Sequence, residues 1–203
     1  GYRIAGQIVT QNSEIFSPIT VQSYVNDIFS LASFDASEEI RNSGELDFSF
    51  SVPGTGRFRA NVYRQRGSLA VVLRYVMFDL PDYRQLNIPE SVINLSNLSK
   101  GIVLITGAAG SGKSTTLSCM IDTINSTRSC HIITIEDPIE FLHKHKKSFI
   151  SQREINIDTK NYINALRAAL RQSPNVILLG EMRDYETITT AMTAAETGQL
   201  ILS

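Results

Sequence analysis

A glycine-rich octapeptide constrains the fold of this chain more than any other feature. Residues 107–114 read Gly-Ala-Ala-Gly-Ser-Gly-Lys-Ser and match the pattern G-x-x-x-x-G-K-[ST] at every fixed position. An apolar run over residues 102–105 precedes it, and apolar side chains follow at helical spacing, at Leu117, Ile121 and Ile124. The pattern therefore predicts a buried parallel strand, a loop and a helix in this order.

Such a loop before a helix is suited to holding a polyphosphate. Glycines allow backbone N–H groups to turn inward around phosphate oxygens, and the helix N-terminus adds the positive end of its dipole. Lys113 is placed to reach the β- and γ-phosphates, while the hydroxyl of Ser114 can bind Mg²⁺. We therefore predict that the chain binds ATP with Mg²⁺. The predicted nucleotide-binding residues are Gly107, Ala108, Ala109, Gly110, Ser111, Gly112, Lys113, Ser114 and Thr115.

Acidic residues follow two further apolar runs, as hydrolysis of a bound nucleotide would require. The run at 131–135 leads into a cluster of three acids, and the run at 176–179 leads through a glycine into Glu181. Parallel strands bring their carboxyl ends to one edge of the sheet, so these groups are expected near the loop. Glu181 can hold Mg²⁺ through its water shell, and one acid of the cluster can orient or deprotonate the attacking water. The alternative is that these acids are only helix N-caps or solvated loop residues. The acids of the cluster are Glu136, Asp137 and Glu140.

The second half of the chain, residues 86–203, alternates strand and helix patterns, as expected of a parallel α/β sheet. The predicted strands are 102–106, 131–135, 176–180 and 200–203. The predicted helices are 112–125, 159–172 and 184–197.

The first half, residues 1–85, is predicted to be a separate domain with an antiparallel meander and helices. A helical pattern follows Thr20, which we interpret as its N-cap. Prolines and polar residues at 79–89 indicate a linker to the second half. The predicted strands are 3–9, 46–52, 58–64 and 69–78.

Composition excludes some classes of partner. The formal net charge is −1, so no overall basic field would recruit nucleic acid. No apolar run approaches the roughly 20 residues of a membrane span, so no membrane insertion is expected. Cys119 and Cys130 lack a metal-binding spacing and are interpreted as reduced core thiols. The basic run at 143–147 is interpreted as a solvated loop.

Both ends of the chain suggest a piece of a longer protein. The sequence begins without a methionine, and it stops within the apolar run at 200–202. We therefore expect that the start of the first domain and the C-terminal part of the second lie outside it.

Several motifs together resemble the type IV pilus retraction ATPases, the PilT family of hexameric secretion motors. The acidic segment 134–141 and the string Gly-Glu-Met-Arg-Asp at 180–184 are specific to this superfamily. The similarity spans nearly the whole chain. The matching segments are 47–50, 56–61, 107–114, 134–141, 152–154, 165–167, 180–187 and 194–198.

The resemblance implies a fold and a set of roles. The fold would be α/β, with a RecA-like P-loop NTPase core preceded by a small PAS-like α+β domain. Glu140 would be the general base for water, and Glu181 the Walker B glutamate. Arg59 and Arg74 would reach the nucleotide of a neighbouring subunit, whereas the residues alone favour an ordinary strand surface for both. Lys113, Glu140, Glu181, Arg59 and Arg74 are thus the candidate catalytic residues, with Ser114 and Glu181 as candidate Mg²⁺ ligands.

The resemblance also implies an activity and partners. The chain would be the subunit of an ATP-hydrolysing homohexamer that powers pilus retraction and twitching motility. It would be cytoplasmic, peripheral at the inner membrane, and would act on a membrane platform protein of the pilus.

One residue departs from the family pattern, and two other functions stay open. Gln199 stands where the family usually has a histidine close to the nucleotide, and a glutamine there can form hydrogen bonds but cannot take up a proton. The first alternative is an ATPase for pilus extension or type II secretion. The second is a nucleotide-binding regulatory paralogue with little turnover.

Overall fold

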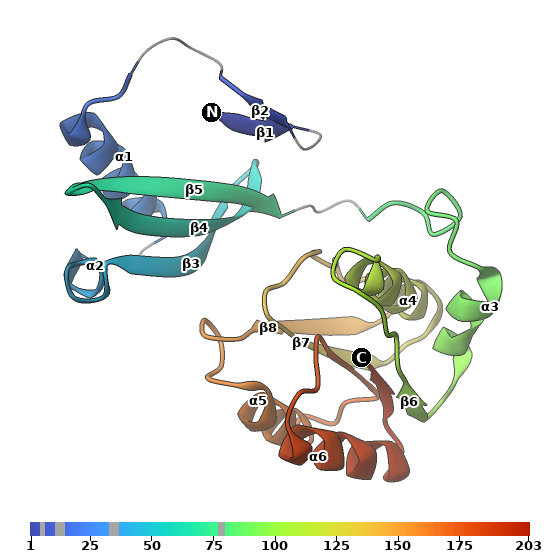
Figure 1. Cartoon of the computed structure of the whole chain (residues 1–203). Helices are drawn as coiled ribbons and strands as arrows, with labels where there is room; N and C mark the ends of the chain where they lie inside the picture. Colours follow the sequence, from blue (N-terminus) through green and yellow to red (C-terminus); the bar gives the residue numbers. More distant parts are fainter. Residues whose placement is uncertain (5–6, 11–14, 33–36, 77–79) are drawn as a thin grey trace. The chain divides into compact units, whose positions relative to one another are not determined.

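The computed structural model describes residues 1–4, 7–10, 15–32, 37–76 and 80–203. It divides into two compact units, Gly1–Tyr75 and Val76–Ser203, each of which is described by itself (Figure 1). The sequence placed the domain boundary later, at 85/86. Leu80, Tyr83 and Ile88 pack against the core of the second unit, so residues 80–85 lie with that unit.

The first unit contains a three-stranded antiparallel sheet in the order β3-β4-β5. The antiparallel meander predicted from the sequence is confirmed, although Met77 and Phe78, at the end of the predicted strand 69–78, lie outside the described residues. Helices α1 and α2 contact the sheet. The elements are β1 Tyr2–Ile4, β2 Gln7–Val9, α1 Pro18–Leu31, α2 Ser37–Ser43, β3 Glu45–Val52, β4 Gly56–Gln65 and β5 Ser68–Val76.

Two predictions at the N-terminus were wrong. The run at 3–9 forms two antiparallel strands, β1 and β2, rather than one strand. The N-cap of α1 is Ser17, not Thr20: the Ser17 hydroxyl accepts a hydrogen bond from the backbone N–H of Thr20 at 3.2 Å. Pro18 then begins the helix, where its missing N–H costs nothing.

The core of the first unit lies on one face of the sheet. Ala60 and Val62 of β4 are fully buried there, and α1 covers them with residues such as Val25 and Phe29. Side chains alternate along a strand, so Arg59 of β4 belongs to the opposite face. On β5, Leu69 and Val71 pack against the core, which places Arg74 on that same opposite face.

The second unit is built on a parallel sheet of five strands in the order β6-β10-β9-β7-β8. This is the RecA-like arrangement expected from the sequence. Its elements are α3 Glu90–Ile93, the 3₁₀ helix η1 Asn94–Asn97, β6 Gly101–Val103, α4 Lys113–Thr127, β7 His131–Glu136, β8 Phe149–Glu154, α5 Tyr162–Ala169, β9 Val176–Leu179, α6 Tyr185–Glu196 and β10 Leu200–Leu202.

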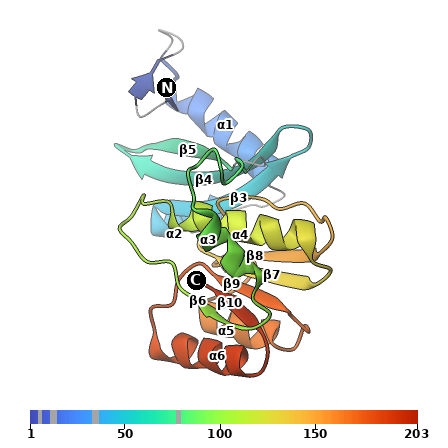
Figure 2. The same cartoon turned by 90° about the vertical axis from the view of Figure 1, so that its right-hand side faces the viewer.

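Helices cover both faces of this sheet. Figure 2 shows α4 on one side and α5 with α6 on the other. Ile132 of β7 packs towards α4, whereas Ile133 and Ile135 pack towards α5 and α6. Burial on both faces explains why the central strands are continuous apolar runs. The carboxyl ends of all five strands meet at one edge, where the loop after β6 begins.

Several bounds in the second unit differ from those expected. β8 was not predicted, and β6 ends at Val103 instead of 106. α5 begins at Tyr162 because the side chain of Asn161 accepts from the N–H of Asn164 at 2.9 Å. It ends at Ala169, three residues before the predicted end.

The two cysteines are free thiols, as predicted. Cys119 is buried in α4, and burial raises its pKa to about 11, with a smaller contribution from the negative charge of Asp122. Cys130 is half-buried, and its sulfur lies 3.2 Å from the hydroxyl of Ser148. Within the described ranges, no helix is both long enough and apolar enough to cross a bilayer.

Candidate functional site

The loop between β6 and α4 has a backbone that only glycine adopts readily. Gly110 and Gly112 have φ angles of 76° and 91°, in the left-handed region. A side chain at Gly107 would lie 2.7 Å from the hydroxyl oxygen of Ser111, which is too close. α4 begins directly after this loop, at Lys113, so its first free N–H groups lie beside the loop.

Lys113 closes over the loop from which it emerges. Its ammonium group donates to the carbonyl oxygens of Gly107 at 3.0 Å and Ala108 at 2.9 Å. The side chain of Ser114, one residue further, lines a pocket at the carboxyl edge of the sheet. The loop thus presents N–H groups, an ammonium group and a hydroxyl on one side.

The pocket beside Ser114 is lined by the acidic residues that were predicted to follow the strand ends. It has a volume of about 70 Å³, which is space for several water molecules. Ser114, Glu140 and Glu181 lie in its wall, so the structure brings these three predicted residues together. The other lining residues are Leu117, Ser118, Glu136, Asp137, Pro138, Tyr162, Leu178 and Gly180.

Glu136 has the most perturbed carboxyl group of this pocket. Burial raises the pKa of Glu136 to about 7, and hydrogen bonds only partly offset this effect. Its Oε1 accepts from the hydroxyl of Thr134 at 2.6 Å and from the amide nitrogen of Gln152 at 3.4 Å. The carboxyl group of Glu136 therefore retains its proton to a higher pH than an exposed glutamate does.

Tyr162 brings a hydroxyl group to the same acidic surroundings. A Cβ atom at Gly180 would lie 3.0 Å from the Tyr162 hydroxyl oxygen and 3.4 Å from the Cα of Glu136, so a side chain at this position would crowd both residues. Burial raises the pKa of Tyr162, and the negative charges of Glu181, Asp137 and Glu136 raise it further. The hydroxyl group therefore stays protonated and can donate a hydrogen bond within the pocket.

The oxygen atoms of the pocket suit Mg²⁺, which prefers hard oxygen ligands and keeps several of its waters. Glu181 is half-buried and pairs with Arg183 at 2.8 Å, while Glu140 is exposed. Among the described residues, no three His, Cys, Asp or Glu side chains converge as the ligands of a metal ion. The residues therefore fit an ion held by one or two protein groups, water and a phosphate.

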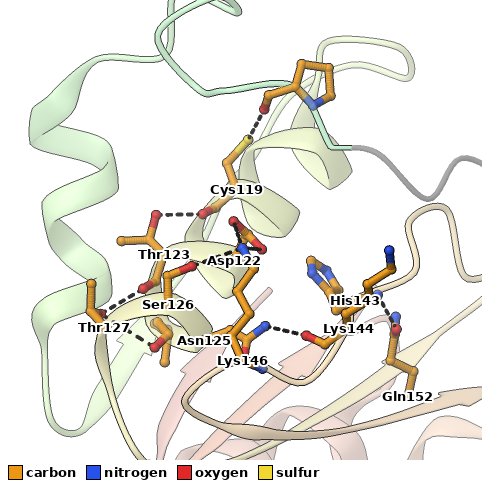
Figure 3. Close-up of polar contacts among 12 residues, drawn as sticks. Cys119, Asp122, Thr123, Asn125, Ser126, Thr127, His143, Lys144, Lys146 and Gln152 are labelled. Atoms are coloured by element: carbon orange, nitrogen blue, oxygen red, sulfur yellow. Dashed lines mark hydrogen bonds and ion pairs between the residues drawn. The ribbon is translucent and has the colours of Figure 1, made fainter.

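The segment after the pocket is attached to α4 by hydrogen bonds and an ion pair, while residues 144–147 are exposed, in agreement with the interpretation of 143–147 as a solvated loop. The ammonium group of Lys146 lies 2.7 Å from a carboxylate oxygen of Asp122. Asn125, which is fully buried, donates to the carbonyl of Lys144 at 2.8 Å and accepts from the N–H of Lys146 at 3.1 Å (Figure 3). His143 is half-buried, and burial lowers its pKa.

Asn125→Ala is expected to destabilise the second unit by about 1–3 kcal/mol. The substitution removes both side-chain bonds and leaves the carbonyl of Lys144 and the N–H of Lys146 without these partners. The measurement is denaturant unfolding, with Asn97→Ala as an exposed control. A midpoint equal to that of the control would show that the 143–147 segment does not depend on Asn125.

The remaining predicted residues lie elsewhere. Arg59 and Arg74 belong to the first unit and share one face of its sheet. Gln199 follows α6, and its side-chain oxygen accepts from the hydroxyl of Thr197 at 2.9 Å. The side chain of Gln199 is thus bound by Thr197, the C-cap residue of α6.

Two residues of the pocket were missed as functional candidates. Tyr162 was not among the predicted site residues; it packs against the core, and its hydroxyl lies at the pocket. Glu136 was grouped with the other acids without a role of its own. Its position in the sequence could have indicated a role, because Glu136 directly follows the apolar run at 131–135. It is the last residue of β7 and is half-buried there.

Comparison with known proteins places this chain in a family of secretion system proteins. The family described as "Type II/IV secretion system protein" matches residues 58–203. The type IV pilus retraction ATPase PilT of Pseudomonas aeruginosa is 50% identical over 157 residues, 77% of this chain and 46% of that protein. A twitching motility protein of Neisseria gonorrhoeae is also 50% identical over 157 residues, 77% of this chain and 42% of that protein.

A solved structure agrees with this placement. The crystal structure of the pilus retraction motor PilT with bound ADP matches with a TM-score of 0.85 and 46% identity. The match covers 98% of this chain and 58% of that chain. This chain thus spans less than half the length of the two curated relatives and somewhat more than half of the solved chain.

Proposed function

Because the chain belongs to the type II/IV secretion system protein family, we propose that it is the ATP-binding and ATP-hydrolysing part of a motor for type IV pilus retraction. The observation that carries this proposal is the pocket in which Ser114, Glu140 and Glu181 meet beside the glycine-rich loop. The relatives named for pilus retraction and twitching motility support the direction of the motor.

The loop and the start of α4 bind the phosphates, and residues of the pocket bind the metal ion. Lys113 exchanges its bonds to the carbonyls of Gly107 and Ala108 for bonds to the β- and γ-phosphates. The N–H groups at the start of α4 bind the remaining phosphate oxygens. Ser114 and Glu181 would hold Mg²⁺, Glu181 through water, and the ion supplies positive charge that offsets the charge of the phosphates.

The acidic wall of the pocket prepares water for attack on the γ-phosphate. Glu140 accepts a proton from that water as the water oxygen bonds to phosphorus and the bond to the leaving oxygen breaks. The protonated Tyr162 hydroxyl orients the water or the nearby carboxylates by donating a hydrogen bond. Burial of Glu136 keeps its carboxyl partly protonated near neutral pH, which reduces repulsion between the acids and the nucleotide.

The whole motor requires neighbours and a partner. We propose a homohexamer in which Arg59 and Arg74 of one subunit contact the nucleotide of the next. Their position on the face of the sheet opposite the core of the first unit supports this role. The motor would lie in the cytoplasm at the inner membrane and act on the pilus platform protein, with no nucleic acid involved.

Cells that carry Lys113→Ala in the full-length gene are expected to show excess surface pili and no twitching movement. Loss of the lysine removes the main cation facing the phosphates, so retraction stops while extension continues. The measurement is the number of pili per cell by electron microscopy, together with twitching zones. Lys100→Ala, an exposed lysine outside the loop, is the matched control.

Other outcomes would assign a different role. Bald cells would contradict retraction and support a motor for pilus extension or secretion. An unchanged number of pili with normal movement would contradict a pilus motor and support a regulatory paralogue. In that case the purified full-length protein would also be expected to turn over little ATP.

A further inference from the structure

A single glutamine on β8 binds both ends of the segment that carries Glu140. The side-chain nitrogen of Gln152 donates to the carbonyl of Phe141 at 2.9 Å and to the carboxylate of Glu136 at 3.4 Å. Its side-chain oxygen accepts from the N–H of His143 at 2.8 Å (Figure 3). Only an amide supplies two donors and an acceptor at once, so these bonds account for the choice of residue.

Glu154, two residues further along β8, binds the middle of the same segment. Its Oε2 accepts from the backbone N–H of Ile139 at 3.3 Å, and the residue is only 3% exposed. Residues i and i+2 of a strand share a face, so Gln152 and Glu154 approach the segment from the same side. The parallel register of β7 and β8 fixes their position along the sheet, because Thr134 pairs with Gln152 and Glu136 pairs with Glu154.

The two contacts flank Glu140 in the sequence. Glu154 fixes the N–H of Ile139, the residue before Glu140, and Gln152 fixes the carbonyl of Phe141, the residue after it. The side chain of Glu140 is exposed, and its backbone N–H donates to the carboxylate of Glu136, while both neighbouring peptides are held by buried or half-buried side chains. The backbone on both sides of Glu140 is therefore fixed by β8.

We propose that the side chains of Gln152 and Glu154, here called the β8 bracket, position Glu140 for its reaction with water. This inference rests on the proposed function, because the bracket acts only through Glu140, the proposed general base for ATP hydrolysis. It gives a role to Gln152 and Glu154 of the string Gln-Arg-Glu at 152–154, one of the segments that resemble the retraction motors. Neither bracket residue touches the reacting atoms in this account.

The first test compares Gln152→Met with the wild type in the full-length protein. Methionine has nearly the same length but cannot make the three hydrogen bonds. We expect kcat for ATP hydrolysis to fall about 10- to 100-fold, because a displaced catalytic group loses rate of this order. KM and the dissociation constant for ADP should stay within about twofold, since the phosphate-binding loop is untouched. Gln172→Met, at an exposed glutamine, is the matched control.

A second pair of variants keeps the test decisive if Gln152→Met does not fold. Glu154→Gln retains an oxygen that can accept from Ile139, whereas Glu154→Leu does not. We expect Glu154→Gln to hydrolyse ATP within about threefold of the wild-type rate and Glu154→Leu to lose rate as Gln152→Met does. This rescue by the conservative variant is not expected of residues that merely fill space.

Asn125→Ala separates positioning from general loosening. It releases the far end of the same segment, at 144–146, without touching the bracket. We expect it to lower stability with little change in kcat. Equal loss of kcat in Asn125→Ala and Gln152→Met would overturn a specific role of the bracket.

Two failures can be told apart. An active wild type with an equally active Gln152→Met variant would overturn the bracket alone. A wild-type full-length protein that binds ADP but never hydrolyses ATP would overturn the proposed hydrolysis, and with it any role of the bracket in hydrolysis.

Discussion

Glu140→Gln is expected to lower the rate of ATP turnover strongly and to leave nucleotide binding intact. Glutamine has the shape of glutamate but cannot accept the proton that water must lose. Removal of a general base costs about 10²–10⁴ in rate, so kcat should fall by that factor. The phosphate contacts of the loop do not involve Glu140, which is why the ADP dissociation constant should not change. The measurements are steady-state phosphate release and titration with a fluorescent nucleotide.

Glu196→Gln provides the control for this result. Glu196 is an exposed glutamate at the end of α6, outside the pocket, so the same substitution there should not affect turnover. Full turnover by Glu140→Gln would contradict the assignment of the base. Glu136, the acid with the raised pKa, would then be the next candidate, to be tested by Glu136→Gln.

Arg59→Ala is expected to lower ATP turnover by about 10³-fold or more, because an arginine that reaches the transferred phosphoryl group is worth about 10³–10⁵ in rate. The alternative is an ordinary charged residue on a strand, for which the loss would be small. Arg64→Ala, on the exposed end of the same strand, is the matched control. Phosphate release by the assembled full-length protein distinguishes the two.

Mixing variants tests whether the arginine acts on a neighbour's nucleotide. Arg59→Ala subunits retain Lys113, and Lys113→Ala subunits retain Arg59. In a random equal mixture, about a quarter of the interfaces would combine an intact loop with an intact arginine from the next subunit. Recovered activity would support action between subunits. Activity no higher than that of either variant alone would contradict it.

The parallel core could be predicted from sequence because its strands are buried on both faces. Residues 131–135, 176–179 and 200–202 are continuous apolar runs, and β7, β9 and β10 lie there. β8 could not be predicted in this way, because it is an edge strand of mixed character. Ile150 is buried, whereas the neighbouring Phe149 is 74% exposed. The position of β8 beside β7 depends on strand pairing, which the local sequence pattern does not specify.

The candidate site was only partly predictable for a similar reason. The loop at 107–112 and the strand-end acids follow from local pattern and from the rule that parallel strands end at one edge. The location of the Tyr162 hydroxyl depends on where α5 begins and on the absence of a side chain at Gly180. The hydrogen bonds of Gln152 depend on the register between β7 and β8. These are distant contacts, and sequence alone does not specify them.

The state of the two cysteines has a practical consequence for measuring motion in this protein. With a pKa of about 11, only about one Cys119 in 10⁴ would be a thiolate at pH 7, so Cys119 would react little with maleimides. Cys130→Ser would keep a hydrogen-bonding group next to Ser148 while removing the other native thiol. Single cysteines introduced on the exposed surface of each unit could then carry a fluorophore pair. The distance between the units could be followed during ATP turnover, one molecule at a time.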